Sequence, residues 1–207
     1  MSFKKSSRRK RISGPERRKL LLDKALELFA SRGYHAVSID QIAAAAEVTK
    51  PVVYDHFGSK QELYLEVCRS IREALLAAGK SVIFPANGLE RRIRAGVDSF
   101  FAFSERNPAA IQVLQTPPRD EPAIYAAVQV IQNEATDAIL QIVIAAGVKK
   151  PSTPSEREKI RIQVEFIKQG LHGLAEWKMH HEAVSRKQLV DGVTALLCDG
   201  ISGEPSQ

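Results

Sequence analysis

The chain has 207 residues, of which 44% are hydrophobic and 26% are charged, values that are ordinary for a globular protein with a sizeable core. No run of about eighteen apolar residues occurs, which excludes a transmembrane helix, and no apolar stretch of the signal-peptide type follows the basic amino terminus. Apolar residues recur at spacings of three and four, and the alternation typical of strands is nowhere sustained. The sequence therefore predicts an all-α protein that stays in the cytoplasm and does not contact a membrane.

Positive charge is concentrated at the amino-terminal end. Residues 1–60 hold 13 Lys and Arg against 6 Asp and Glu, a net charge of +7, whereas residues 61–207 hold 17 against 18, a net charge of −1. This asymmetry favours nucleic acid or an anionic surface as the partner of that end, with a solubilising tail as the alternative. Residues 1–13 are predicted to form a disordered basic arm, which would contact the DNA backbone or minor groove.

The first predicted helix runs from Pro15 to Ser31, because proline suits a first helical turn and the apolar residues that follow form one stripe. Gly33, directly behind it, fits a C-cap. These assignments place a conventional amphipathic helix just after the basic arm.

Two short helices follow, separated by a tight turn. Ser38 and Gln41 have the spacing of a capping box, and the helix that they open is predicted to end near Ala46. The next helix starts at Thr49 or, because a proline at 51 disfavours helical geometry in the residue before it, uses Lys50 as its cap. Two short helices joined in this way predict a helix–turn–helix, the alternative being a plain three-helix scaffold.

A long helix is then predicted from Ser59, which with Glu62 forms a second capping box, to about Gly79. Proline and glycine separate the remaining helices. These are predicted over residues 88–106, 108–116, 120–146, 155–182 and 186–200.

The strongest motifs lie between residues 17 and 66. They read GY-x-x-x-S-I-x-x-IA, AEVTK-x-x-VYDHF and SKQEL, and they resemble the tetracycline-repressor (TetR) family of transcription regulators. "GLHGLAEW" near the second-last helix is a weaker match. The resemblance implies a DNA-binding domain over 14–74 and a ligand-binding and dimerisation domain over 75–207. It also implies a homodimer on a palindromic operator, acting most often as a repressor that a small molecule releases.

The helix that would face DNA can be oriented from its apolar residues. Val53 and Phe57 are expected to face inward, so Pro51 and Asp55 point outward with Val52 beside them, and these three would read bases. Phosphate contacts, which set the register on DNA, are expected from Ser38, Thr49, Lys50, Tyr54, His56 and Lys60, and Gln41 completes the DNA-binding set. Simple N-capping is the other role open to Ser38 and Thr49.

The two carboxy-terminal helices each carry more apolar surface than one chain needs to bury. We expect a four-helix bundle between two copies, the alternative being burial within the monomer. The predicted dimer interface consists of Phe166, Gly170, Gly173, Trp177, Leu189, Val193, Leu196 and Leu197.

A ligand pocket is expected among the helices between residues 60 and 174. Its candidate lining residues, for which ordinary core packing is the alternative, are Phe100, Phe103, Ile111, Leu114, Val128, Gln129, Ile131, Ile167 and Leu171. Gln129 and Gln132 interrupt an apolar helix and would orient a ligand or be exposed. The sequence does not indicate the chemistry of the effector.

No catalytic or metal-binding constellation stands out. His172, Glu176 and His180 have helical spacing, but charged residues on the same face, such as Lys168, predict a solvated surface rather than a metal site. Cys68 and Cys198 are expected to be buried, reduced thiols. No nucleotide-binding or hydrolase motif occurs, so we expect that the protein binds no cofactor and is not an enzyme. A helical binding module and a nonspecific DNA-packaging protein are the remaining alternative functions.

Overall fold

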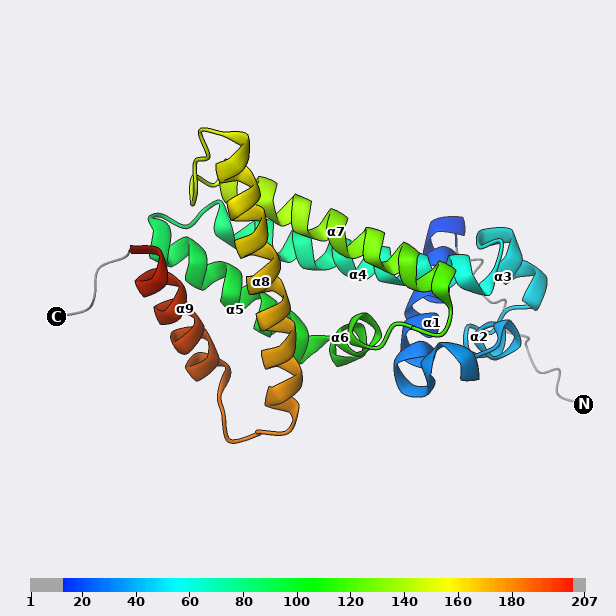
Figure 1. Cartoon of the computed structure of the whole chain (residues 1–207). Helices are drawn as coiled ribbons and strands as arrows, with labels where there is room; N and C mark the ends of the chain where they lie inside the picture. The colour runs from blue at the N-terminus through cyan, green and yellow to red at the C-terminus, as the bar shows by residue number, and fades with distance from the viewer. Residues whose placement is uncertain (1–12, 203–207) are drawn as a thin grey trace, which may run out of the picture.

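The computed structural model describes residues 13–202, and within that range it consists of nine helices and no strand, which confirms the all-α prediction (Figure 1). Residues 1–12 of the predicted basic arm (1–13) lie outside the described residues, and its last residue, Ser13, is the N-cap of the first helix rather than part of a disordered arm. The helices are α1 (Gly14–Ala36), α2 (Ile39–Ala45), α3 (Lys50–His56), α4 (Lys60–Ile83), α5 (Leu89–Arg106), α6 (Pro108–Gln115), α7 (Pro122–Ala145), α8 (Pro154–Met179) and α9 (Arg186–Ser202).

Helix α1 is longer at both ends than predicted. Ser13 caps it, and a capping box with Glu16 satisfies the first backbone N–H groups. Gly33 leaves helical geometry with a φ of 76°, as suits a glycine that ends a helix, and one further turn follows it.

Helices α2 and α3 form the predicted helix–turn–helix. Gln41 Oε1 accepts from Ser38 N at 2.8 Å and Ser38 Oγ accepts from Gln41 N at 3.2 Å, which confirms the first capping box. Thr49, not Lys50, is the N-cap of α3, but its side chain makes no capping hydrogen bond. The prediction that the Thr49 hydroxyl caps this helix is therefore wrong, and only its backbone carbonyl serves, accepting from Val52 N at 3.0 Å.

Helix α4 begins as predicted, with Ser59 as its N-cap, but its capping box is incomplete and its carboxy-terminal end lies later than predicted. Ser59 Oγ accepts from Glu62 N at 3.0 Å, but the Glu62 carboxylate accepts from Gly58 N, also at 3.0 Å, so only half of the second capping box forms. The helix continues to Ile83, past the predicted end at Gly79. It runs without interruption from the helix–turn–helix end into the larger helical body (Figure 1).

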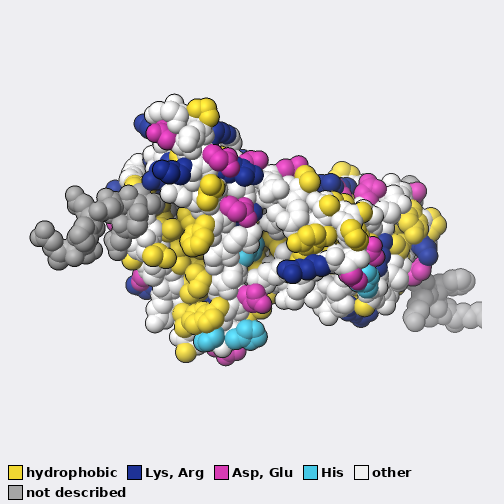
Figure 2. Space-filling model, in the orientation of Figure 1, with side chains coloured by type: hydrophobic (Ala, Val, Ile, Leu, Met, Phe, Trp, Pro, Cys, Tyr) yellow, Lys and Arg dark blue, Asp and Glu magenta, His cyan; other side chains and the backbone are white. Residues whose placement is uncertain are grey.

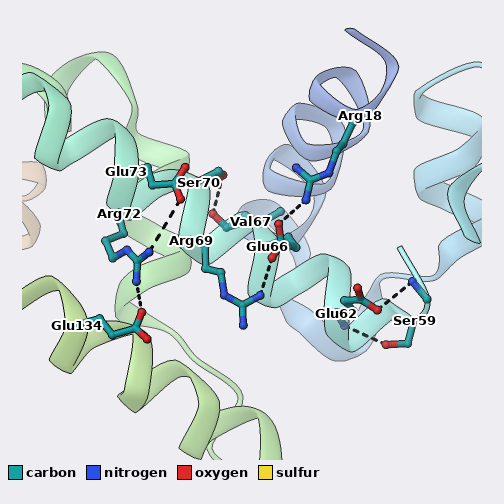
Figure 3. Close-up of polar contacts among 11 residues, drawn as sticks. Arg18, Ser59, Glu62, Glu66, Val67, Arg69, Ser70, Arg72, Glu73 and Glu134 are labelled. Atoms are coloured by element: carbon teal, nitrogen blue, oxygen red, sulfur yellow. Dashed lines mark hydrogen bonds and ion pairs between the residues drawn. The ribbon is translucent and has the colours of Figure 1, made fainter. Parts of the chain in front are cut away.

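Ion pairs join α4 to the helices on either side of it (Figure 3). Glu66 accepts hydrogen bonds from Arg18 of α1 and from Arg69 of α4. Six residues after Glu66, Arg72 donates to Glu134 of α7. These contacts place α1, α4 and α7 in one connected framework.

The two cysteines differ in environment. Cys68 is buried, and desolvation raises the pKa of its thiol to about 12, which makes it unreactive at neutral pH. Cys198 is only half-buried, so the prediction of burial holds for Cys68 and is wrong for Cys198.

Candidate functional site

Helix α3 is held to the body by two side chains. Val53 and Phe57 are buried, as predicted, and the Arg18 guanidinium lies 5.0 Å from the centroid of the Phe57 ring, within range of a cation–π contact. A helix of seven residues is not stable in water by itself. Its position therefore depends on these anchors.

The opposite face of α3 is open to solvent. Pro51 and Asp55 are exposed, and Tyr54 is 44% exposed, while Val52 and His56 are half-buried. The three residues predicted to read bases thus lie on or beside the side of α3 that faces away from the core.

The two lysines of the predicted phosphate-binding set are held by neighbours that the sequence did not single out. Lys50 Nζ lies 3.0 Å from Asp40 Oδ2, and this hydrogen bond raises the pKa of Lys50. Lys60 Nζ lies 4.2 Å from the centroid of the Tyr34 ring, and partial burial lowers its pKa. Both cations lie at the helix–turn–helix end, but the charge of Lys50 is balanced by Asp40, whereas Lys60 contacts an uncharged ring.

The polar residues around α2 and α3 differ in whether their side chains make capping hydrogen bonds. Ser38, Gln41 and Thr49 are all exposed, but the side chains of Ser38 and Gln41 bond to each other's backbone. Thr49 is the one of the three whose hydroxyl is not committed to a cap.

A second candidate site is an apolar cavity of about 250 Å³ bounded by α4, α5, α7 and α8. Five of the nine predicted pocket residues line it: Phe100, Leu114, Ile131, Ile167 and Leu171. Gln132 also lines it, whereas Gln129 is exposed. Phe103 and Val128 are buried in the core, and Ile111 lines a different depression beside α8.

The face of α8 that carries Lys168 and His172 was predicted to be solvated, but it lines the cavity. Lys168 is only 7% exposed and, with His172, lines the cavity. The Lys168 ammonium lies 2.8 Å from Glu165 Oε2 and donates to Gln132 O at 3.0 Å and to Thr136 Oγ1 at 2.8 Å. These partners explain how a charged side chain is tolerated inside the body. Within the described part of the chain, no group of three or more His, Cys, Asp or Glu could hold a metal ion.

The outer face of α8 carries a row of exposed apolar residues. Phe166 is 74% exposed, Gly170 and Gly173 face open space, and the Trp177 ring stacks on His181 with centroids 3.9 Å apart. Figure 2 shows hydrophobic side chains gathered along this helix. The predicted interface residues of α9 are divided: Leu196 is exposed, Val193 half-buried, Leu189 buried in the core, and Leu197 lines the cavity.

A capped two-helix motif that presents one exposed face, ahead of a larger helical body, defines a helix–turn–helix DNA-binding regulator. Residues 21–67 match the family of bacterial regulatory proteins named for tetR. The transcriptional activator FasR of Mycolicibacterium smegmatis is 30% identical over 94% of this chain and 87% of its own length. This chain therefore belongs to the TetR family, as its motifs predicted.

Two further comparisons agree. The transcriptional repressor KstR2 of Rhodococcus jostii is 32% identical over 48% of each chain. The structure of the fatty acid degradation regulator FadR from Bacillus halodurans superposes with a TM-score of 0.73 over 90% of this chain and 96% of that chain, at 18% identity. At that identity the likeness shows a common fold.

Proposed function

We propose that two copies of this chain bind a palindromic operator, each placing α3 in the major groove, and that a small molecule in the cavity regulates this binding. The exposed face of α3 carries the proposal: Pro51 and Asp55 are exposed and Val52 is half-buried beside them, and a recognition helix presents residues of such a face to base edges. Val52 would contact a thymine methyl group and Asp55 would accept from a cytosine amino group. Thr49, Lys50, Tyr54, His56 and Lys60 would hold phosphates, together with Ser38 and Gln41 at the start of α2.

Dimerisation is supported by the apolar row on α8 and by Leu196, which is 69% exposed on the following helix, α9. The glycines at 170 and 173 leave room for a second helix to approach. Two such helices from each copy would form a four-helix bundle, and a dimer would present two recognition helices to the half-sites of a palindrome.

In this proposal residues 14–74 form the DNA-binding domain and residues 75–207 the effector and dimerisation domain, with α4 shared between them. The cavity is lined by residues of the second domain and by Arg72, at the end of the first. We assign no catalytic step and no cofactor to the chain, and its action on chromosomal DNA would take place in the cytoplasm. In the described part of the chain, no helix has the length and apolar character to cross a membrane.

We propose repression as the outcome of operator binding. The named relatives include both an activator and a repressor, so a promoter fusion must decide the sign. Expression that rises when the gene is deleted supports repression, and expression that falls means activation.

A gel shift with the DNA upstream of the gene tests specific binding. Saturable binding to one palindrome, resistant to random competitor DNA, supports the regulator. Equal competition by random DNA would favour a nonspecific DNA-packaging protein, and no shift at low salt would leave a helical binding module.

Deleting residues 1–12 should weaken binding to all sequences and reduce its salt dependence, because that segment holds six Lys and Arg.

A further inference from the structure

The cavity is elongated along the helices that form it. Its lining on α4 extends from Arg72 to Ile83, a separation of 11 residues, which spans about 17 Å at the helical rise. The lining on α8, from Ile160 to His172, covers a similar length. One end, here called the inner end, lies beside α6, where Gln115 Nε2 donates to His172 O at 2.9 Å. The other, the outer end, lies where Arg92 donates to the Ala146 carbonyl at the end of α7.

The walls between these ends are almost entirely apolar. They include Leu75, Leu76, Ile93, Ala135, Ile139 and Ile167. A carbon chain advances about 1.25 Å per bond, from a bond length of about 1.52 Å and an angle of about 111°. The cavity therefore has the length of an unbranched chain of about 13 carbon atoms.

All four charged side chains that line the cavity are cations, namely Arg72, Arg92, Lys149 and Lys168. At the inner end the positive charge is balanced, because Arg72 pairs with Glu134 and Lys168 pairs with Glu165. His172 at the same end is neutral at pH 7, since burial and the nearby Lys168 lower its pKa to about 4.

At the outer end the positive charge is not balanced. Arg92 donates to two backbone carbonyls, those of Ala86 at 2.9 Å and Ala146, and carbonyls carry no net charge. Lys149 makes no hydrogen bond or ion pair within residues 13–202. A half-buried position with two cations and no carboxylate partner is suited to an anion.

We propose that the effector is an anionic amphiphile with an unbranched apolar chain. Its carboxylate or phosphate head binds Lys149 and the free N–H groups of Arg92, and its chain extends inward to Phe100 and Leu114. This inference rests on the proposed effector role of the cavity. It adds the sign of the ligand's charge, the end at which the head lies, and the length of the chain.

Isothermal titration calorimetry of the full chain tests the ligand class with four probes below their micelle concentrations. We expect saturable binding of tetradecanoate or tetradecyl phosphate, with the tighter of the two identifying the head group. Hexanoate should bind at least about tenfold more weakly, because much less apolar area is buried. Tetradecyltrimethylammonium should also bind at least about tenfold more weakly. Equal or tighter binding of this cation would overturn the proposal.

Lys149→Ala should weaken tetradecanoate binding by about tenfold, as expected for removing one charged partner of a carboxylate. Lys159→Ala is the matched control, since Lys159 is also a lysine, is exposed on α8 and does not line the cavity. Equal affinities of the two variants would refute the head-group site.

Ala135→Trp fills the cavity midway and should abolish tetradecanoate binding. Circular dichroism checks that this variant is still a folded helical protein, and undiminished binding would place the ligand elsewhere.

Operator binding, measured separately by gel shift, distinguishes this inference from the proposed function. Specific operator binding without saturable binding of either anionic probe would overturn the ligand class and leave the DNA-binding regulator intact. Tetradecanoate binding that depends on Lys149, in a protein that binds no specific DNA, would support the ligand class and reject the regulator.

Discussion

Replacing Phe57 by alanine should destabilise the helix–turn–helix end, because this side chain is the larger of the two anchors of α3. Phe57 is 1% exposed and directly follows the last residue of α3, where its backbone N–H closes the final turn by donating to Val53 O at 2.9 Å. The substitution keeps that backbone bond and removes only the ring. Its effect therefore measures how much the docking of α3 depends on one buried aromatic.

The magnitude follows from the burial of the ring. A fully buried Phe removes about 150–250 Å² from water, and at about 25 cal/mol per Å² this corresponds to about 4–6 kcal/mol as an upper limit. Substitutions of Phe by Ala in cores cost about 3–5 kcal/mol. The contact with Arg18 adds about 0.5–1 kcal/mol, because the guanidinium is partly exposed. We therefore expect a loss of about 3–5 kcal/mol.

Urea denaturation followed by circular dichroism provides the measurement. With a slope of about 2 kcal/mol per molar urea, the midpoint should fall by about 2 M, and operator affinity should fall with it. Tyr54→Ala is the control on the exposed face, expected to change stability by less than about 0.5 kcal/mol while weakening operator binding about tenfold. A Phe57→Ala protein with an unchanged midpoint would refute the view that this ring holds α3 in place.

Three further predictions test other parts of the structure. Ser38→Ala should cost about 1 kcal/mol in urea denaturation, whereas Thr49→Ala should cost less than about 0.5 kcal/mol, because its hydroxyl makes no capping bond; equal losses would contradict this difference. Phe166→Glu should convert a dimer to a monomer in light scattering, and a persistent dimer would place the interface elsewhere. His172 has its pKa lowered from 6.5 to about 4, so the folded state disfavours protonation. Stability should fall by about 3 kcal/mol as pH falls from about 6.5 to about 4, and His172→Gln should show a smaller fall.

The helix–turn–helix was predictable because its signals are local. Ser38 and Gln41 lie three residues apart in the sequence, and Val53 and Phe57 form the only strongly apolar pair at i, i+4 in α3 and its C-cap. What the sequence did not reveal is the pairing of Lys50 with Asp40, which joins two helices at an angle that only the folded turn sets. Thr49 was misread for a related reason, since a hydroxyl of suitable type at a cap position need not point at the helix.

The cavity was less predictable because its lining depends on how α8 crosses α5 and α7. Val128 and Ile131 belong to the same helix and are both buried, yet only Ile131 reaches the cavity. Lys168 was read as solvated because lysine is rarely buried. Its burial depends on Gln132 and Thr136 of α7, more than 30 residues away in sequence, and nothing on α8 itself signals them.

Helix α4 supplies the physical link between the two candidate sites. Arg72 lines the cavity and pairs with Glu134 of α7, and Glu66, about 9 Å earlier along the same helix, bonds to Arg18 of α1 (Figure 3). Arg18 in turn lies over Phe57, the anchor of α3. An α-helix transmits displacement along its axis, so a ligand that changes the spacing of α4 and α7 would also move the support of α3. Such a ligand would change operator affinity only if it binds the two spacings of α4 and α7 with different free energies. The Arg72–Glu134 ion pair borders the cavity and joins both helices, so a ligand in the cavity would act on it directly.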